Sequence, residues 1–340
     1  MKLVAIIDAT VKLPGLEDLT LYRSAASIPF AGRYRLIDFT LSNIVNSGIT
    51  SVGVFPSYPF VSLMDHIGRG KSWDLDRRKD GLFFLPVSTK DSGQMSVGGF
   101  AALEEHMVFF ERSRQEYAVI TNCFTVSQID YEDMLESHIE SGADVTEAVS
   151  NGQPLRSYIL KRSLLIEFLK NYRQNQVFSV EDCVRRKKSS YKFGVYEYEG
   201  YCAVIDSIDS YFKASMDLLE PEKRNALFLP ERPIYTKVKD EPPTRYMKGS
   251  SVKRALVANG STIRGTVVDS IISRAVVIKE NTKADHCIIM QKCTIEENCD
   301  LAYVIADKNV FIEAGTVLKG TAEEPIVLRK GERILKEEVR

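Results

Sequence analysis

The sequence predicts two domains of different class: a doubly wound α/β domain, followed by a left-handed parallel β-helix of hexapeptide repeats. Over the first part of the chain, short apolar runs alternate with segments whose apolar residues recur at helical spacing. From Val252 onward this spacing gives way to branched apolar residues every six positions. We therefore expect domains at residues 1–232 and 251–322, a proline-rich linker at 233–250 and a C-terminal tail at 323–340.

Length, composition and charge set the limits within which this prediction stands. The 340 residues are 44% hydrophobic and 27% charged, which is ordinary for a globular chain. Forty-five basic against 46 acidic side chains give a net charge of −1, so we expect neither a nucleic-acid nor a membrane partner. The longest apolar runs, such as Leu3–Ile7, are far shorter than the roughly 20 residues that cross a bilayer. We expect a cytoplasmic protein without a signal peptide.

The α/β domain begins with the apolar run Leu3–Ile7, which is typical of a strand buried on both faces. In residues 35–47 the apolar side chains Ile37, Leu41 and Ile44 share one helical stripe, and Gly48 follows as a C-cap. The same alternation continues downstream, with strands predicted at Ser51–Phe55 and Tyr117–Thr121, and helices near 101–110, from Asp130 to Gly142 and from Ser207 to Leu219.

After the stiff, proline-rich linker, a six-residue rhythm predicts short strands stacked in a triangular coil. Each strand places one branched apolar residue inward, and the fourth position after it holds a small residue. The inward positions expected are Val257, Ile263, Ile271, Val277, Ile289, Ile295, Leu301, Phe311 and Val317. Cys287, Cys293 and Cys299 follow the same step and match no common zinc spacing, so we interpret them as core residues with reduced thiols.

One long motif resembles a known family. Residues 23–43 read R-S-A-A-S-I-P-F-A-G-R-Y-R-L-I-D-F-T-L-S-N. This is similar to the signature R-A-K-P-A-V-P-F-G-G-[KR]-[FY]-R-[LI]-I-D-F-x-L-S-N of the glucose-1-phosphate adenylyltransferases. Residues 46–49, 199–201 and 208–211 extend the likeness. The resemblance implies a nucleotidyltransferase-like (Rossmann-like) first domain, joined to the β-helix, in a family that makes ADP-glucose for glycogen synthesis.

The chain departs from that family in the segments that carry its chemistry. Where catalytic members have the phosphate loop G-G-x-G-T-R-L, residues 10–16 read T-V-K-L-P-G-L, with Gly15 in place of the arginine. Ala25 replaces the lysine of R-A-K-P. The resemblance further implies that Phe124 and Val204 occupy the positions of the two aspartates that hold Mg²⁺ in the catalytic members. The first domain is therefore expected to be a degenerate nucleotidyltransferase-like domain without catalytic residues or a metal of its own.

These departures resemble the regulatory-type subunit that accompanies the catalytic one in many Gram-positive bacteria. The expected function is regulation of a glucose-1-phosphate adenylyltransferase in glycogen biosynthesis. The expected partner is the catalytic subunit, in a heterotetramer, with Mg²⁺ bound only by that partner. Two alternatives stay open: a weakly active adenylyltransferase, and a β-helix acyltransferase that uses His286 as general base.

Basic clusters are the remaining candidates for a binding site. Arg23, Arg33 and Arg35 lie within a dozen residues and can clamp the phosphate of a sugar-phosphate or nucleotide effector. The alternative is an ion-paired subunit contact, and the sequence leaves both open. The basic run from Arg185 to Lys188 is interpreted as a solvated surface turn, with an anion site as its alternative.

Overall fold

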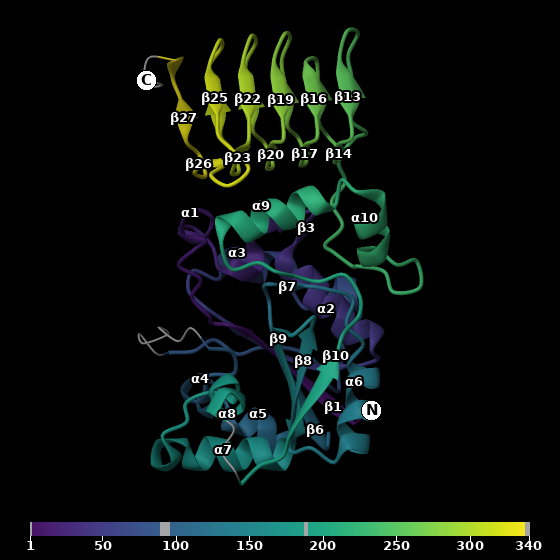
Figure 1. The fold of residues 1–340 in the computed structure, drawn as a ribbon, viewed down its shortest axis with the longest axis vertical. Helices are drawn as coiled ribbons and strands as arrows, with labels where there is room; N and C mark the ends of the chain where they lie inside the picture. The colour runs from purple at the N-terminus through teal and green to yellow at the C-terminus, as the bar shows by residue number, and fades with distance from the viewer. Residues whose placement is uncertain (1, 89–95, 187–189, 337–340) are drawn as a thin grey trace.

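The fold comes from a computed structural model that describes residues 2–88, 96–186 and 190–336. Figure 1 shows the two expected domains stacked along the long axis, with the β-helix above the α/β domain. The chain crosses from one to the other through residues 228–244, in which the structure has no helix or strand. Both the doubly wound domain and the left-handed β-helix class are confirmed.

A seven-stranded sheet, in the order β10-β8-β9-β6-β1-β4-β5, organises the first domain. Strand β9 runs antiparallel to both of its neighbours, and the other pairs are parallel. Every residue of the central strand β1 is buried, as its apolar run predicts. The strands are β1 Leu3–Ala9, β4 Ser51–Pro56, β5 Gly81–Phe84, β6 Tyr117–Asn122, β8 Val145–Ser150, β9 Gln153–Lys161 and β10 Phe193–Glu197.

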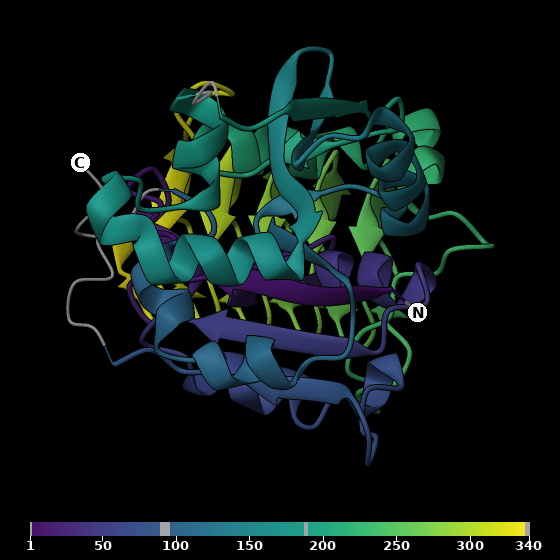
Figure 2. The ribbon, with the colours of Figure 1, turned by 90° about the horizontal axis from the view of Figure 1, so that it is seen from below.

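Helices pack around this sheet, and Figure 2 shows α7 lying across it with the β-helix behind. The predicted caps are present: the side chains of Asp130 and Ser207 accept backbone N–H groups at the starts of α6 and α9, and Gly142 ends α6 with a φ of 59°. The helices are α1 Glu17–Thr20, α2 Leu36–Asn46, α3 Val61–Ile67, α4 Phe100–Glu104, α5 Met107–Arg112, α6 Tyr131–Ser141, α7 Arg162–Asn175, α8 Val180–Arg186, α9 Ile208–Asp217 and α10 Pro221–Leu227.

The helix predicted near 101–110 is two short helices, because the chain turns at His106. A ring nitrogen of His106 bonds to the carbonyl oxygen of Pro86 at 2.9 Å, outside the helix. Two pairs of short strands complete the domain, β2 Pro29–Phe30 with β3 Tyr34–Arg35, and β7 Thr125–Val126 with β11 Ala203–Val204. The second pair joins two of the segments that depart from the family motif, those around Phe124 and Val204.

The β-helix consists of three parallel sheets, one on each side of the triangular coil. It extends on both sides of the expected range 251–322, because β12 already pairs with β15, and because β26 and β27 lie within the expected tail. One sheet is β12 Arg245–Tyr246, β15 Thr262–Ile263, β18 Val277–Ile278, β21 Thr294–Ile295, β24 Phe311–Ile312 and β27 Arg333–Ile334. The second is β13 Ser251–Lys253, β16 Thr266–Val268, β19 Lys283–Asp285, β22 Asp300–Ala302 and β25 Val317–Lys319, and the third is β14 Leu256–Val257, β17 Ile271–Ile272, β20 Ile288–Ile289, β23 Val304–Ala306 and β26 Ile326–Leu328.

The hexad register is right over part of the β-helix and shifted by one residue elsewhere. Paired residues such as Val277, Thr294 and Phe311 recur every 17 positions, whereas three full hexads would give 18. The inward positions predicted at Ile263, Ile289, Ile295 and Leu301 are buried, but Ile278, Ile312 and Leu318 are buried in place of their predicted neighbours Val277, Phe311 and Val317. Cys287, Cys293 and Cys299 are buried free thiols in this core, as predicted.

The two domains share an apolar interface. Ile271, Ile288 and Ile305 lie on the sheet that contains β17, β20 and β23, and each is at most 2% exposed. Ile288 and Ile305 belong to the same continuous apolar core as the first domain. Beside them, the guanidinium of Arg23 pairs with the carboxylate of Asp307 at 2.8 Å, and both side chains are almost fully buried. The β-helix is therefore packed onto the first domain along one whole face.

This buried ion pair gives a stability prediction. Arg23→Met leaves the Asp307 carboxylate buried without its counter-ion, which is expected to lower the free energy of unfolding by about 3–5 kcal/mol in chemical denaturation. The double variant Arg23→Met with Asp307→Leu is expected to recover most of that loss. Arg264→Met breaks the exposed pair with Glu280 and serves as the matched control, with a change below about 1 kcal/mol. Equal losses at the buried and the exposed pair would contradict a structural role for Arg23.

Candidate functional site

The chain departs from the family motif at Gly15, Ala25, Phe124 and Val204, which we call the degenerate positions. The structure brings Gly15, Phe124 and Val204 together. The backbone N–H of Ile205 donates to the carbonyl of Phe124 at 2.9 Å, and Val204 pairs with Thr125 across β11 and β7. At the other end of this segment the N–H of Ile208 donates to the carbonyl of Gly15 at 2.8 Å. The expected phosphate loop and both expected metal positions thus meet in one hydrogen-bonded unit, as the family resemblance implies.

The loop of residues 10–16, where the family resemblance places a phosphate loop, packs against the protein through its apolar side chains. Val11 and Leu13 are 6% and 9% exposed, and Leu16 is fully buried. The loop starts at Asp8, whose Oδ1 accepts the N–H and the hydroxyl of Thr10 at 2.9 and 2.6 Å. Of the loop's backbone N–H groups, that of Thr10 is bonded to Asp8 and that of Leu16 to the carbonyl of Leu13, and Pro14 has none to offer to a phosphate.

Gly15 is needed where it stands because the backbone of residues 206–207 passes directly over it. A Cβ atom at this position would lie 2.7 Å from the carbonyl oxygen of Asp206 and 2.9 Å from the Cα of Ser207. Both neighbours are backbone, which cannot move aside as a flexible side chain can. The arginine of the catalytic family therefore cannot be accommodated here without displacing the segment that carries Val204.

The first expected metal position is filled by a packed aromatic ring. Phe124 is fully buried, and the Arg156 guanidinium lies 5.5 Å from the centre of its ring. The turn before it is held by Asn122, whose side-chain oxygen accepts the N–H groups of Phe124 and Thr125. Arg156 also pairs with the buried Glu181 at 3.6 Å. A neutral ring thus fills the position at which a carboxylate was expected to bind the metal ion. The arginine beside this ring is itself paired with a glutamate of the same chain.

The residues present do not fit the Mg²⁺ ion that the fold family implies. Phenylalanine and valine offer no oxygen ligand. The nearby carboxylate of Asp8 is occupied on both oxygens, because Oδ1 accepts from Thr10 and Oδ2 accepts the N–H of Gly98 at 2.7 Å. We derive no catalytic step through a metal at this site.

Ala25, the fourth degenerate position, lies in the short 3-10 helix Ala25–Ser27 and is 7% exposed. It lines a cavity of about 240 Å³ beside the loop of residues 10–16, together with Lys12, Tyr58 and the buried Arg23. This cavity retains a lysine, but not at the position where the family motif places it.

A second cavity, of about 270 Å³, lies where the first domain, the interdomain segment and the β-helix meet, and we call it the basic cavity. Glu241 is the acidic residue of its wall, and His66 and Tyr34 also line it. Eight basic side chains face it: Arg33, Arg35, Lys237, Lys239, Arg274, Lys292, Lys308 and Lys330. This excess of positive charge in a partly enclosed space is suited to a small polyanion.

The geometry of the β-helix explains how these cations gather. Arg274, Gln291 and Lys308 occupy equivalent corner positions in successive coils, since the residue after each bonds to the carbonyl of the coil before. Parallel coils stack about 4.8 Å apart, so the side chains of one corner form a column. This column and the two linker lysines are absent from the sequence-based predictions. Arg274 and Lys308 lie two coils of 17 residues apart, and this spacing, with the alternation of Lys237 and Lys239 in an extended segment, is the signal that points to them.

Burial and mutual repulsion perturb these groups. Burial, followed by the charges of Arg35 and Arg23, lowers the pKa of Lys308 to about 7. Burial lowers the pKa of Arg35 to about 10, with Asp38 opposing and Arg23 adding to the shift. The pKa values of Lys239 and Arg274 are lowered for the same reason, burial first and neighbouring cations next. An anion in the cavity would favour the charged forms and so oppose each shift.

The three arginines singled out by the sequence separate into two groups. Arg33 and Arg35 line the basic cavity, where Arg35 also donates to the carbonyl and hydroxyl of Ser62 at 2.6 and 3.0 Å. Arg23 lies behind this wall, buried, and donates to Asp307 and to the carbonyl of Leu19. Arg23 thus forms an ion pair within the chain, whereas Arg33 and Arg35 remain available to an anion.

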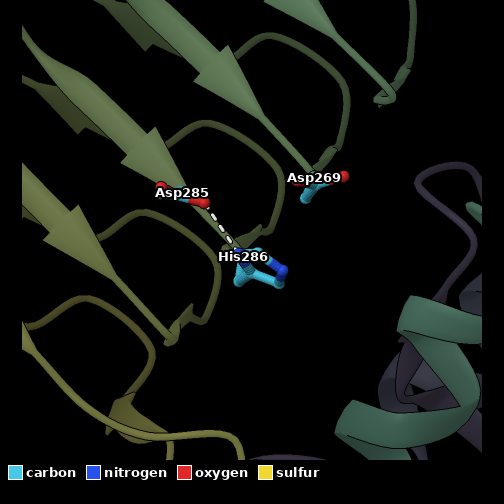
Figure 3. Close-up of side chains that lie close together, drawn as sticks. All are labelled: Asp269, Asp285 and His286. Carbon is cyan, nitrogen blue, oxygen red and sulfur yellow. Dashed lines mark hydrogen bonds and ion pairs between the residues drawn. The ribbon is translucent and has the colours of Figure 1, made fainter.

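His286 lies at another corner of the β-helix, on the coil next to that of Asp269 (Figure 3). Its Nδ1 bonds to Asp285 at 2.7 Å, and its ring stacks on Tyr303 at 4.9 Å. Within the described part of the chain, these three His and Asp side chains are the group close enough to share a metal ion. Their carboxylates are already paired, Asp269 with Arg254 at 2.6 Å and Asp285 with Lys283 at 2.8 Å. The cluster is a ladder of ion pairs, and it supplies no argument for the acyltransferase alternative.

The basic run at the end of α8 also carries internal ion pairs. Arg185 pairs with Glu181, and Arg186 pairs with Asp182 at 2.7 Å. Lys187 and Lys188 lie outside the described residues.

None of the helices in the described part of the chain is long and apolar enough to span a membrane.

Comparison with known proteins places both halves of the chain in known families. Residues 15–158 match the nucleotidyl transferase family, and residues 242–324 match the GlmU-like C-terminal hexapeptide family. Among curated proteins, the glycogen biosynthesis protein GlgD of Bacillus subtilis (strain 168) is 48% identical over 330 residues, covering 97% of this chain and 96% of that protein. GlgD of Geobacillus stearothermophilus is 50% identical over 331 residues, with the same coverage. The glucose-1-phosphate adenylyltransferase of Bacillus anthracis is 28% identical over 356 residues, covering 94% of this chain and 95% of that protein.

The close approach at Gly15 gives a second prediction. Gly15→Ala is expected to lower the free energy of unfolding by about 1–3 kcal/mol, because the new methyl group overlaps the backbone of residues 206–207. Lys12→Ala, an exposed change in the same loop, is the control and is expected to stay within about 0.5 kcal/mol. Denaturant titration of both variants measures the difference. An alanine at position 15 that is tolerated as well as the one at position 12 would contradict this close packing.

Proposed function

Because the chain belongs to the family of the GlgD glycogen biosynthesis proteins, which are related to glucose-1-phosphate adenylyltransferase, we propose that it is a non-catalytic regulatory subunit of such an enzyme. The reaction regulated is the formation of ADP-glucose and diphosphate from ATP and glucose 1-phosphate. One observation carries the proposal: the buried ring of Phe124 and the strand residue Val204 lie together, and these are the positions at which the family resemblance implies two metal-binding aspartates.

Several further features support a role exerted through contact. The sheet, the β-helix and the interface between them are intact although Gly15, Phe124 and Val204 depart from the family motif, so we propose that the surfaces for assembly with a related subunit are kept. A subunit that retains the family fold can occupy an equivalent place in a symmetric oligomer. We propose a heterotetramer with the catalytic subunit, in which only that partner binds Mg²⁺. Coupling between such subunits is commonly worth about 1–3 kcal/mol.

We further propose that the basic cavity binds the anionic effector, a sugar phosphate or a nucleotide. Arg33 and Arg35 from the first domain face Arg274 and Lys308 from the β-helix across this cavity. An anion held there contacts both domains at once, so its binding energy depends on how they are placed relative to each other. This is the property that an effector site needs in order to bias a conformational equilibrium.

The proposed role predicts a defined result when the purified chain is titrated into a catalytic subunit. The chain alone is expected to form no ADP-glucose above background in the presence of Mg²⁺. The mixture is expected to show a larger mass by light scattering and a substrate or effector saturation curve shifted by about 5- to 150-fold. The variant Lys253→Gln changes an exposed residue of β13 that does not line the cavity, and it is the control for surface charge.

Two outcomes would contradict this prediction. Turnover by the isolated chain that persists after removal of contaminating enzyme would favour the alternative of a weak adenylyltransferase. A chain that neither changes the mass of the catalytic subunit nor its saturation curves is not its regulatory subunit.

The cavity also predicts pH-dependent anion binding, which sulfate can probe because its charge is constant near neutral pH. Lys308 is charged below its pKa of about 7 and neutral above it, and an anion favours the charged form. Sulfate is therefore expected to bind about five- to tenfold more weakly at pH 8.5 than at pH 6, measured by calorimetry at constant ionic strength. Lys308→Arg keeps the charge at both pH values and should bind equally well at each.

His66 is the other group in this cavity that needs a control. Burial lowers its pKa, although the hydrogen bond to Asp38 opposes the shift, so the imidazole is already neutral over most of the tested range. His66→Gln should keep the pH dependence of sulfate binding. If the pH dependence is lost in His66→Gln and kept in Lys308→Arg, the titrating group is His66, and the prediction for Lys308 is wrong.

A further inference from the structure

We propose that Lys308 is a modification site at which small acyl phosphates acylate the lysine amine inside the basic cavity. The proposal rests on the anion-binding part of the proposed function and adds a covalent consequence to it. The chemical class of the reagent is a carboxylic–phosphoric mixed anhydride. Its phosphate would be held by the cavity arginines, and its acyl group transferred to Lys308.

The position of Lys308 carries the first step of this inference. It lines the cavity from a corner of the β-helix, between Gln291 and Lys330 in the neighbouring coils. Its backbone N–H is bonded to Asp307 at 2.6 Å, which holds the main chain in place. Among the described residues its amine makes no hydrogen bond or ion pair, whereas the amine of Lys237 donates to the carbonyl of Asp65 at 2.5 Å.

The state of the amine carries the second step. With its pKa lowered to about 7 by burial and by Arg35 and Arg23, about half of Lys308 is the free amine at pH 7. An ordinary lysine, with a pKa near 10.4, has only about 0.04% free amine at that pH. A desolvated lysine beside other cations is the usual form of an activated lysine nucleophile. Lys308 is thus reactive at a pH at which exposed lysines are protected.

The cavity has the groups and the space to bind the reagent by its phosphate. Arg35 and Arg274 are planar donors suited to a phosphate group, and a cavity of about 270 Å³ has room for a small phosphate ester or anhydride. The side chain of Gln291, which lines the same wall, has a buried oxygen without a partner among the described residues, so its amide is free to turn toward a ligand. Binding the phosphate end brings the carbonyl carbon near the amine and raises its effective concentration.

The reaction is balanced without a further reagent. The Nζ lone pair of Lys308 attacks the carbonyl carbon, and a new C–N bond forms. The bond between that carbon and the bridging oxygen breaks, and the electron pair leaves with inorganic phosphate. The amine loses one proton, which the departing phosphate or water takes up. The product is a neutral amide, so the cavity permanently loses a group that could carry positive charge.

Acetyl phosphate is the probe, used on the full chain at pH 7.5 with peptide mass spectrometry to follow each lysine. Lys308 is expected to be acetylated about tenfold faster than Lys292 and Lys330, which line the same cavity; the gain in free amine is partly offset because a less basic nucleophile is weaker. Lys253→Arg, an exposed change outside the cavity lining, is the control and should leave the rate at Lys308 unchanged. Lys308→Arg should remove the fast phase and leave the slow sites as they were.

Two comparisons test whether the phosphate guides the reaction. Sulfate at saturating concentration and the variant Arg274→Gln are each expected to slow acetylation at Lys308 by at least about fivefold. p-Nitrophenyl acetate, a neutral acyl donor, should react at an unchanged rate in Arg274→Gln, and sulfate should slow it only by favouring the charged form of the amine. Acetylation at Lys308 no faster than at Lys292, or a fast reaction indifferent to both sulfate and Arg274, would overturn the proposal. Mass measurements with the catalytic subunit are read separately, so a failure to assemble leaves this result intact.

Discussion

Burial of one outward-facing apolar column of the β-helix against the α/β domain is the constraint on which the other features depend. A β-helix strand normally turns one side chain into the coil and the next toward solvent. In this chain the doublets at Ile288–Ile289 and Ile305–Ala306 bury both, one in the coil and one in the core of the first domain. The β-helix is consequently packed against the first domain. Movement of the β-helix away from that domain would expose this apolar column to water.

That docking explains why so many cations lie together without a balancing number of acids. The corner of the coil beside the apolar face carries Arg274, Lys308 and Lys330, and the fold directs this corner toward Arg33 and Arg35 of the first domain. Burial first, and then repulsion between neighbouring cations, lowers the pKa values of Lys308 and Arg35. Stability gained at the apolar interface offsets the cost of holding these cations together.

The sequence was sufficient for the fold class because the periodic signals are local and strong. Strand β1, the caps at Asp130 and Ser207, and the six-residue rhythm all depend on residues close together in the chain. The hexad register failed at Phe311 and Val317 because the true coil length is set by how strands of different coils pair, which a local pattern does not contain. The candidate site followed the same rule. Arg33 and Arg35 are local to the family motif and were found, whereas the β-helix cations that complete the cavity are more than 200 positions away.

The departures from the family motif at Gly15, Phe124 and Val204 form one packing arrangement rather than independent changes. Gly15 permits the backbone of residues 206–207 to approach, this segment follows directly after β11, and β11 pairs with the strand that follows Phe124. An arginine at position 15 would displace the segment, and a carboxylate at position 124 would be buried beneath the pair of Arg156 and Glu181. Restoring any single residue therefore works against the packing of the others.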